Sequence, residues 1–388
     1  MRILYLALDI RLDEVSGDAI HVHEATRALT AIGASVDLVV PSIEGKRQSH
    51  EGLQKAGVRI HSITAKGDVQ VALACRKIAA EVKAQVIYER RYSPKIAAAV
   101  SRATRLPFLV EVNGLPDVEI AALGRFAKGS KAVKAVKSRL RKSLYARASR
   151  VVAVTPGIAT LLQARYDIPG EKVVILPNAA DTEAFRPGDR TAAKKALHLP
   201  ANAPVIGFVG TLYPWHGLQY LIEAAPAIVR AHPDALFLIV GDGPQRAELE
   251  ARVMAARLAA NFRFTGRVDH ERVPEHITAS DVCVSLIDAE RYSEKYGFSP
   301  LKLYEYLACG CPVVATRTAG FDILETFECG ALVNPRDPRE VSRTILEMLH
   351  DPPALEAMGK RGRRLAEEQY SWKSVATRLL AVMKEVVG

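Results

Sequence analysis

The chain has 388 residues, of which 49% are hydrophobic and 25% are charged, and its formal net charge is +10. This length suggests two domains of ordinary size, and the composition excludes disordered, collagenous and fibrous classes. No apolar run reaches the roughly 18 residues that a membrane span needs. The five cysteines are odd in number and lack CxxC spacing, so we expect a globular α/β protein of the reducing cytoplasm without a structural metal.

In the first half of the chain, short runs rich in Val and Ile alternate with helical patterns, which indicates βα units and a parallel sheet. The first strand, at residues 3–8, leads through 16–19 into a helix expected at 21–32. Gly17 lies in this turn, where a glycine lets the backbone approach a phosphate and a helix N-terminus favours an anion. Further strands are expected at 36–40, 59–63, 86–89, 108–113 and 151–155.

A basic segment lies between residues 120 and 166, where eleven Lys or Arg occur without any Asp or Glu. Its apolar side chains share one stripe, which predicts a cationic amphipathic helix. Two interpretations stay open: a solvated helix whose stripe docks on its own sheet, or attachment to an anionic membrane surface. No nucleic acid is expected, because no aromatic interleaving accompanies the charge. The stripe comprises Phe126, Val133, Val136, Leu140 and Leu144, and the candidate membrane patch comprises Lys128, Lys131, Lys134, Lys137, Arg141 and Lys142.

A polar, turn-rich stretch near residues 180–200 is the expected linker, after which the alternation of strands and helices begins again. We therefore expect two similar α/β halves, with domains at 1–185 and 186–368 and a final segment at 369–388 that contains a helix at 372–387. The strands expected in the second half are 205–210, 236–240, 263–266, 282–286, 313–315 and 331–333.

The stretch 297–315 has the outline of a site for a diphosphate and a ribose. Ser299 and Pro300 open a helix whose first amides are unpaired, Lys302 lies in its first turn, and Glu305 follows one turn later. A carboxylate accepts two hydrogen bonds from a ribose diol, while the amides and the lysine meet phosphates.

The loop at residues 211–217 follows the first strand of the second half. His216 precedes a glycine at a helix start, where it is either a hydrogen-bond donor to a phosphate or an ordinary surface histidine. The next strand ends in Gly241-Asp242-Gly243-Pro244, which lacks the third glycine of a dinucleotide fingerprint. We therefore do not expect a site for NAD.

Taken together, these motifs resemble the retaining glycosyltransferases of family 4. The resemblance implies the GT-B fold, with two Rossmann-like, doubly wound parallel-sheet α/β domains that face a central cleft, and a last helix that crosses back to the first domain. The blocks that carry it are residues 16–33, Pro177-Asn178, Trp215-His216-Gly217, Gly241-Asp242-Gly243-Pro244, 264–268, 279–282 and above all 299–315.

By this resemblance, the donor substrate is a nucleotide diphosphate sugar, bound mainly by the second domain, and the sugar is transferred with retained configuration and without a cofactor or metal. Glu305 would bind the ribose, Lys302 and the amides of 299–301 would lie near the diphosphate, and Gly17 would close over it from the first domain. The implied donor-binding residues are Gly17, Thr211, His216, Gly241, Arg267, Ser299, Pro300, Leu301, Lys302 and Glu305. The implied acceptor-side residues are Asp18, His21, Glu111 and Asn113, and the implied catalytic residues are Asn113, Lys302 and Glu305.

The sequence departs from the family pattern at three places. Gly297 stands where an earlier glutamate is frequent, Thr211 and His216 replace a basic pair, and Asn113 replaces a histidine. An asparagine forms hydrogen bonds with a sugar hydroxyl but does not exchange a proton.

The expected function is transfer of a sugar to a glycan or lipid-linked acceptor, as in polysaccharide biosynthesis, in the cytoplasm or peripherally at the inner face of the membrane. One alternative is a glycosyltransferase with a soluble small-molecule acceptor. Another is a nucleotide-sugar-binding partner subunit without catalysis, and a nucleotide-sugar epimerase or a sugar phosphorylase is less favoured.

Overall fold

The computed structural model describes residues 1–13, 16–42, 51–114, 131–288 and 297–388, and the side chains of 131–134 are not described. The described residues form two compact units. The first unit comprises Met1–Asn178 and Trp372–Gly388, and the second comprises Ala179–Ser371. The boundary expected at 185/186 lies seven residues after the first of these divisions, and the one expected at 368/369 lies three residues before the second. The expected linker at 180–200 belongs to the second unit and contains the helix α8 (Arg190–Ala196).

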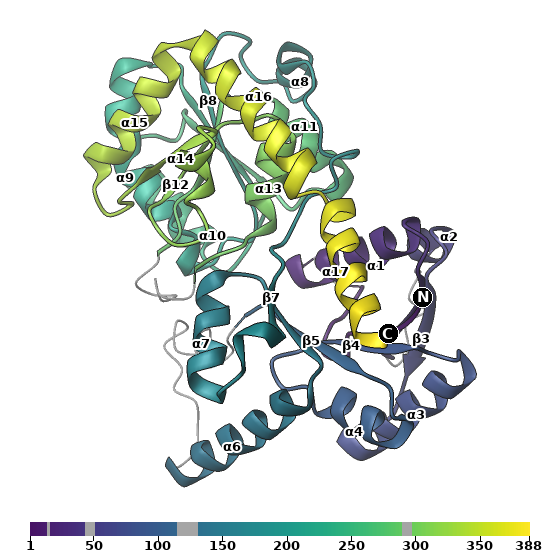
Figure 1. Ribbon diagram of the computed structural model, residues 1–388. Coiled ribbons are helices and arrows are strands. Elements are labelled where there is room, and N and C mark those ends of the chain that lie inside the picture. The colour runs from purple at the N-terminus through teal and green to yellow at the C-terminus, as the bar shows by residue number, and fades with distance from the viewer. Residues whose placement is uncertain (14–15, 43–50, 115–130, 289–296) are drawn as a thin grey trace. The chain divides into compact units, whose positions relative to one another are not determined.

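The first unit is built on a seven-stranded parallel sheet in the order β3-β2-β1-β4-β5-β6-β7 (Figure 1). Its central strands are buried on both faces, as parallel strands covered by helices must be. The strands are β1 (Arg2–Leu6), β2 (Ser35–Pro41), β3 (Arg59–Ile63), β4 (Val86–Arg90), β5 (Phe108–Val112), β6 (Arg150–Ala153) and β7 (Val173–Ile175).

Helices connect these strands, and several begin at side-chain caps. The Ser16 hydroxyl accepts a hydrogen bond from the Ala19 amide at the start of α1. The Thr155 hydroxyl accepts one from the Ile158 amide at the start of α7. The last helix, α17, returns from the second unit and lies beside α1 (Figure 1). The helices are α1 (Gly17–Ala31), α2 (Glu51–Lys55), α3 (Asp68–Glu81), α4 (Lys95–Thr104), α6 (Lys131–Arg147), α7 (Pro156–Tyr166) and α17 (Trp372–Val387).

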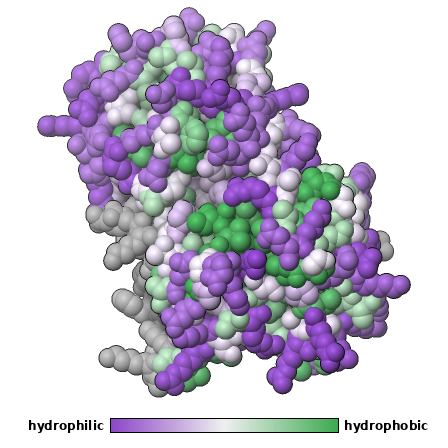
Figure 2. Space-filling view, in the orientation of Figure 1, coloured by the Kyte–Doolittle hydropathy of each residue, from purple (hydrophilic) through white to green (hydrophobic). Residues whose placement is uncertain are grey.

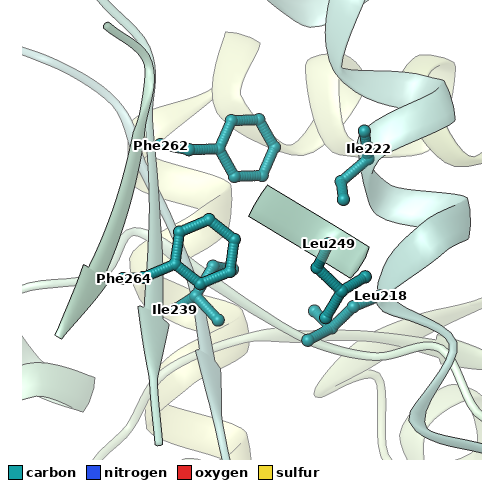
Figure 3. A pocket seen from close by; sticks show the side chains of 6 residues that line it. All are labelled: Leu218, Ile222, Ile239, Leu249, Phe262 and Phe264. Atoms are coloured by element: carbon teal, nitrogen blue, oxygen red, sulfur yellow. The ribbon is translucent and has the colours of Figure 1, made fainter. Parts of the chain in front are cut away.

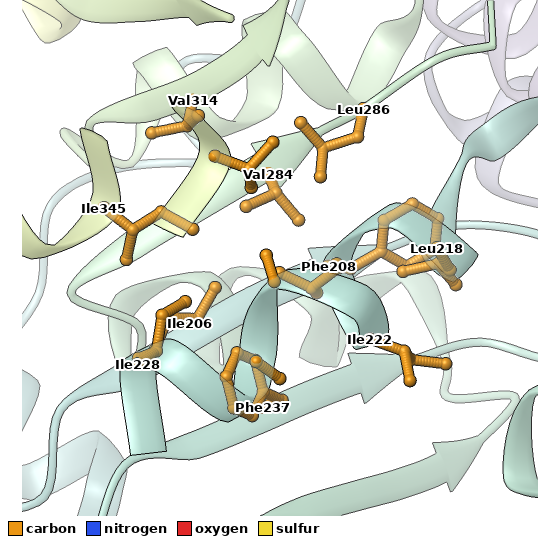
Figure 4. Close-up of a cluster of buried hydrophobic side chains, with 14 of the residues drawn as sticks. Ile206, Phe208, Leu218, Ile222, Ile228, Phe237, Val284, Leu286, Val314 and Ile345 are labelled. Atoms are coloured by element: carbon orange, nitrogen blue, oxygen red, sulfur yellow. The ribbon is translucent and has the colours of Figure 1, made fainter. Parts of the chain in front are cut away.

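The second unit is built on a six-stranded parallel sheet in the order β10-β9-β8-β11-β12-β13. One face of this sheet packs against α9 and α15 through a cluster of Ile, Leu, Val and Phe side chains (Figure 4). The other face packs against α13 and α16. The strands are β8 (Val205–Val209), β9 (Leu236–Val240), β10 (Phe262–Gly266), β11 (Val282–Ser285), β12 (Val313–Thr316) and β13 (Gly330–Val333). The remaining helices are α9 (Leu218–Ala231), α10 (Arg246–Ala255), α11 (Val273–Thr278), α13 (Leu301–Ala308), α14 (Ile323–Thr326), α15 (Pro338–His350) and α16 (Pro352–Gln369).

Two local expectations require correction. The strand β7 was not expected, because it has three residues and none of them is fully buried, so it lacks a strong apolar pattern. The helix α1 begins at Gly17 rather than near His21, because the Ser16 side chain caps it. Gly17 is therefore the first residue of the helix and not part of the preceding turn.

Hydrophilic side chains cover most of the face shown in Figure 2. A small apolar pocket lies between β9, β10, α9 and α10 of the second unit, and Figure 3 shows its hydrocarbon lining. It lacks a polar group that would orient a ligand, so we treat it as a packing defect of the core. Its lining residues are Leu218, Ile222, Ile239, Leu249, Phe262 and Phe264.

Candidate functional site

Each sheet has one point at which the strand order reverses, between β1 and β4 in the first unit and between β8 and β11 in the second. Open parallel sheets bind ligands outside the carboxyl ends of the strands at such a point. The residues singled out in the sequence lie in loops and helices that follow these strands.

In the second unit, the N-terminus of α13 offers unpaired backbone amides. No side chain caps the helix, and within the described ranges the amides of Leu301 and Lys302 have no hydrogen-bond acceptor. Pro300 has no amide hydrogen, so it serves only to set the direction of the chain. The Ser299 hydroxyl forms a 2.9 Å hydrogen bond with the Tyr304 hydroxyl. This helix end can receive the negative charge of a phosphate group.

Lys302 brings a positive charge to the same place. Its Nζ lies 4.1 Å from the centre of the Phe208 ring, and no carboxylate pairs with it among the residues that the structure describes. Gly210 makes room for it, since a Cβ there would lie 2.6 Å from Nζ. Burial lowers the pKa of Lys302 to about 7, although the Glu305 charge acts in the opposite direction. A bound anion would restore the full charge of this lysine.

The loop after β8 positions Thr211 and His216. The ring Nδ1 of His216 donates a hydrogen bond to the Thr211 carbonyl, which can only accept, so the neutral ring carries its lone pair on Nε2. Burial, and then the nearby Lys302 charge, hold the pKa of His216 well below its usual value. At neutral pH His216 therefore presents a hydrogen-bond acceptor, and it would have to take up a proton to donate to a phosphate.

Glu305 is buried one turn after Lys302, and its Oε1 lies 3.3 Å from Nε2 of His270. His270 follows β10 and was not singled out in the sequence. Arg267, between the end of β10 and His270, is exposed. Gly241 lies at the end of β9 with a φ of +129°, where a Cβ would collide with the Gly210 carbonyl. The ends of β8, β9 and β10 thus converge on the helix that carries Lys302 and Glu305.

Asp288, which follows β11, is a second residue that the sequence did not point to. Its carboxylate accepts hydrogen bonds from Arg336 at 3.0 Å and from the Tyr220 hydroxyl at 3.1 Å. Its amide donates to the Trp215 carbonyl at 2.9 Å. The side chain is 4% exposed, so it fixes the loop after β8 from within. Its place directly after a buried strand at the switch point was the available signal.

The four residues of the first unit expected on the acceptor side lie in one polar network. His21 Nδ1 lies 2.8 Å from Asn178 Oδ1, and its Nε2 lies 2.9 Å from Glu111 Oε1. The Asn113 amide donates to Glu111 Oε1 at 3.1 Å. Arg90, at the end of β4, joins the network by pairing with Asp18 at 2.7 Å and with Glu111 at 3.4 Å.

Within this network Glu111 and His21 are buried, whereas Asn113 is half-buried and Asp18 is exposed. Burial acts to raise the pKa of Glu111, but His21 and Arg90 outweigh it and hold the pKa at about 2. Glu111 is therefore a carboxylate at neutral pH. Trp372 of α17 packs edge-on against His21, with ring centres 4.9 Å apart. Asn113 and Asp18 are the members that a ligand can reach.

The expected membrane patch is only partly described. Lys128 lies outside the described residues, as do the side chains of Lys131 and Lys134. Lys137 is exposed, while Arg141 stacks 4.4 Å from the centre of the Tyr92 ring and Lys142 pairs with Asp167.

The apolar stripe of α6 is divided. Leu144 is buried, but Val136 and Leu140 are 65% and 47% exposed, so this part of the stripe does not dock on the sheet. Of the stripe residues, Phe126 lies outside the described residues, as does the side chain of Val133. None of the described helices is both long enough and apolar enough to cross a membrane.

Two family models match the chain, one in each half. Residues 15–184 match the model described as Glycosyltransferase Family 4, and residues 203–351 match the model described as Glycosyl transferases group 1.

Curated relatives are about 30% identical over part of the chain. The 2-deoxystreptamine glucosyltransferase of Streptomyces kanamyceticus is 31% identical over 62% of this chain and 62% of its own length. The GDP-mannose-dependent monoacylated alpha-(1-6)-phosphatidylinositol monomannoside mannosyltransferase of Corynebacterium glutamicum is 31% identical over 54% of this chain and 55% of its own. The D-inositol 3-phosphate glycosyltransferase of Segniliparus rotundus is 30% identical over 61% of this chain and 52% of its own length. The matched stretches thus span between about half and two thirds of these relatives.

Solved structures share the fold over the whole chain. Sucrose-phosphate synthase from Thermosynechococcus elongatus gives a TM-score of 0.78 at 21% identity, with 99% of this chain and 98% of that chain covered. Anabaena HepE in complex with UDP-glucose gives a TM-score of 0.75 at 18% identity, with 99% of this chain and 100% of that chain covered. Together with the two parallel sheets, this likeness confirms the expected GT-B fold.

Proposed function

Since this chain belongs to the group 1, family 4 glycosyltransferases, we propose that it transfers a glycosyl unit from a nucleotide diphosphate sugar to an acceptor hydroxyl. The observation that carries the proposal is the N-terminus of α13. There Lys302 and two unpaired amides face the position of a phosphate, and Glu305 follows one turn later as a buried carboxylate for the ribose.

In this proposal the second unit supplies the charge that stabilises the departing diphosphate. Lys302 and the amides at the start of α13 act as preorganised donors, and no metal has a role. Arg267, Gly241 and Thr211 lie at the neighbouring strand ends, where the remainder of the nucleotide would bind. The transfer retains the anomeric configuration.

The first unit would contribute the acceptor side. Asn113 and Asp18 would bind the sugar or the acceptor by hydrogen bonds, and Glu111 and His21 would hold them in position from beneath. Gly17 would approach the donor from the start of α1. We further propose a lipid-linked or membrane-proximal acceptor, which the exposed Val136 and Leu140 beside Lys137 support.

A thermal-shift panel of UDP, GDP, ADP and dTDP tests the donor site. A ligand at about one hundred times its Kd stabilises a protein by roughly 2.7 kcal/mol, which shifts the Tm of a domain of this size by a few degrees. We expect one nucleotide to stabilise the natural protein and to stabilise Glu305→Gln much less. The exposed Glu347→Gln, in the same unit, is the matched control. If every nucleotide leaves the Tm unchanged, or if Glu305→Gln responds fully, the assignment of α13 is wrong.

A further inference from the structure

The loop after β8 carries a stacked pair of aromatic rings that the donor site does not use. The rings of Tyr213 and Trp215 lie 4.5 Å apart and within 10° of parallel. Tyr213 is 37% exposed, and among the described Phe, Tyr and Trp residues only Phe327, which follows α14, is equally exposed. By contrast, the other tryptophan, Trp372, is 4% exposed. Tyr213 is therefore exposed and Trp215 is half-buried, so the pair presents part of its aromatic surface to solvent.

The loop that holds this pair is fixed at several points. The Asp288 amide donates to the Trp215 carbonyl, and the Leu212 amide donates to the Asp242 carbonyl. Gly217 closes the loop with a φ of +65°, where a Cβ would lie 1.5 Å from the Leu286 carbonyl oxygen. Because the loop is already ordered, a ligand that binds to it loses little free energy in ordering the protein.

A row of rings joins the pair to the candidate donor site. The His216 ring lies 6.3 Å from Tyr213 and 6.1 Å from Trp215, both edge-on, and 5.9 Å from Phe208, over which Lys302 lies. With Nδ1 bound to the Thr211 carbonyl, His216 offers a hydrogen-bond acceptor at Nε2. An aromatic surface with one acceptor suits a ligand that has both an apolar face and hydroxyl groups.

We propose that Tyr213 and Trp215 form a binding surface for a pyranose ring, with Nε2 of His216 accepting a hydrogen bond from one of its hydroxyls. The C–H groups on one face of a pyranose carry partial positive charge and fit the negative face of an aromatic ring. The inference rests on the proposed function, because it supplies that reaction with a sugar-specific subsite.

Tryptophan fluorescence tests the proposal directly. The chain has two tryptophans, and Trp372 is present in both the natural protein and Trp215→Phe, so the difference between their fluorescence changes reports Trp215. The probes are methyl α-D-glucopyranoside and methyl α-D-mannopyranoside, with glycerol as the solvent control. We expect a saturable change with at least one glycoside. Tyr213→Phe should bind the glycoside with unchanged affinity. Tyr213→Ala should bind it roughly tenfold more weakly, which is the size of one good aromatic contact. Phe327→Ala should leave it unchanged.

The absence of a saturable change, or an equal affinity in Tyr213→Ala, overturns the proposal. This failure is separable from failure of the proposed function, because the nucleotide panel reads the α13 site independently. Sugar nucleotides then identify the source of the ring. If the pair binds the transferred sugar, UDP-glucose or GDP-mannose changes the fluorescence more than UDP or GDP and blocks the glycoside. If it binds an acceptor ring, the glycoside titration survives saturation with the sugar nucleotide.

Discussion

Lys302 combines a central position with an unusual proton affinity. Its pKa of about 7 means that the lysine is largely neutral at pH 8 in the free protein. A diphosphate prefers the charged form, so binding above pH 7 should draw in a proton, and the affinity should fall by up to about tenfold per pH unit. A fixed arginine would not behave in this way.

Calorimetry in two buffers checks this expectation. UDP-glucose and GDP-mannose are titrated at pH 8 in HEPES and in Tris. For the ligand that binds, the binding enthalpy should differ between the two buffers by an amount that corresponds to uptake of close to one proton. Lys302→Arg should bind with equal enthalpy in both buffers. Identical enthalpies for the natural protein would show that Lys302 is already charged or does not meet the ligand.

Glu89 is a buried carboxyl group outside both candidate sites. Its Oε2 accepts the Ala97 amide at 2.9 Å, and burial raises its pKa from 4.5 to about 8. Between these values the folded protein keeps a proton that the unfolded chain releases, so stability should fall as the pH rises from about 4.5 to 8. Each pKa unit corresponds to about 1.4 kcal/mol.

Glu89→Gln should remove this dependence. Its unfolding transition should match that of the natural protein near pH 5 and lie above it at pH 8, as measured by thermal unfolding across the pH range. The exposed Glu81→Gln serves as the control. A constant difference between Glu89→Gln and the natural protein at all pH values would mean that Glu89 is ionised in the fold.

At the scale of elements, α6 shows why a sequence pattern leaves a helix's partner open. Of the three stripe residues whose side chains the structure describes, Val136 and Leu140 are exposed, and only Leu144 is buried, next to the buried Tyr145. If the exposed part meets anionic lipid, each nearby lysine contributes about 1 kcal/mol and the two apolar side chains add to this.

Sedimentation with phosphatidylglycerol vesicles tests this element. Lys131→Gln, Lys134→Gln and Lys137→Gln combined should lower binding by up to about a hundredfold, and Val136→Ser with Leu140→Ser should lower it further. The matched control replaces Lys195, Lys360 and Lys373, which are exposed on other helices. Equal binding by the control and the α6 variants, or no binding by the natural protein, excludes the membrane role of this helix.

The elements also show what a sequence can predict. Unbroken runs of Val, Ile, Leu and Phe predict buried parallel strands such as β9, so most strands were predicted with small errors at the strand ends. The half-exposed strand β7 was not predicted. For the candidate site, the sequence placed Lys302 and Glu305 on one helix, which α13 confirms, and their roles stay a prediction that the nucleotide panel tests. Arg90, His270 and Asp288 were missed because the residues that they contact lie 21 to 73 positions away in the chain, and only the fold brings them together.

At the scale of the molecule, the first unit is made from both ends of the chain. Helix α17 buries six apolar side chains, each worth about 1.5 to 3 kcal/mol if large, against a total domain stability of about 5 to 15 kcal/mol. These side chains are Trp372, Val375, Ala376, Leu379, Leu380 and Met383.

A chain that ends at Ser371 should therefore unfold in its first unit while the second unit stays folded. Limited proteolysis with mass spectrometry should then yield early cuts within residues 1–178 and a resistant fragment of the second unit. Removal of 385–388 alone, which are mostly exposed, should change nothing. Equal resistance of the first unit in both shortened chains would show that α17 is dispensable.

The return of α17 also imposes an order on biosynthesis. When the first 178 residues have left the ribosome, the face of α1 that α17 covers still lacks its partner. At about 5 to 20 residues per second, translation of residues 179–371 takes roughly 10 to 40 s before α17 is made. During that interval the nascent first unit exposes this apolar surface, to which chaperones can bind.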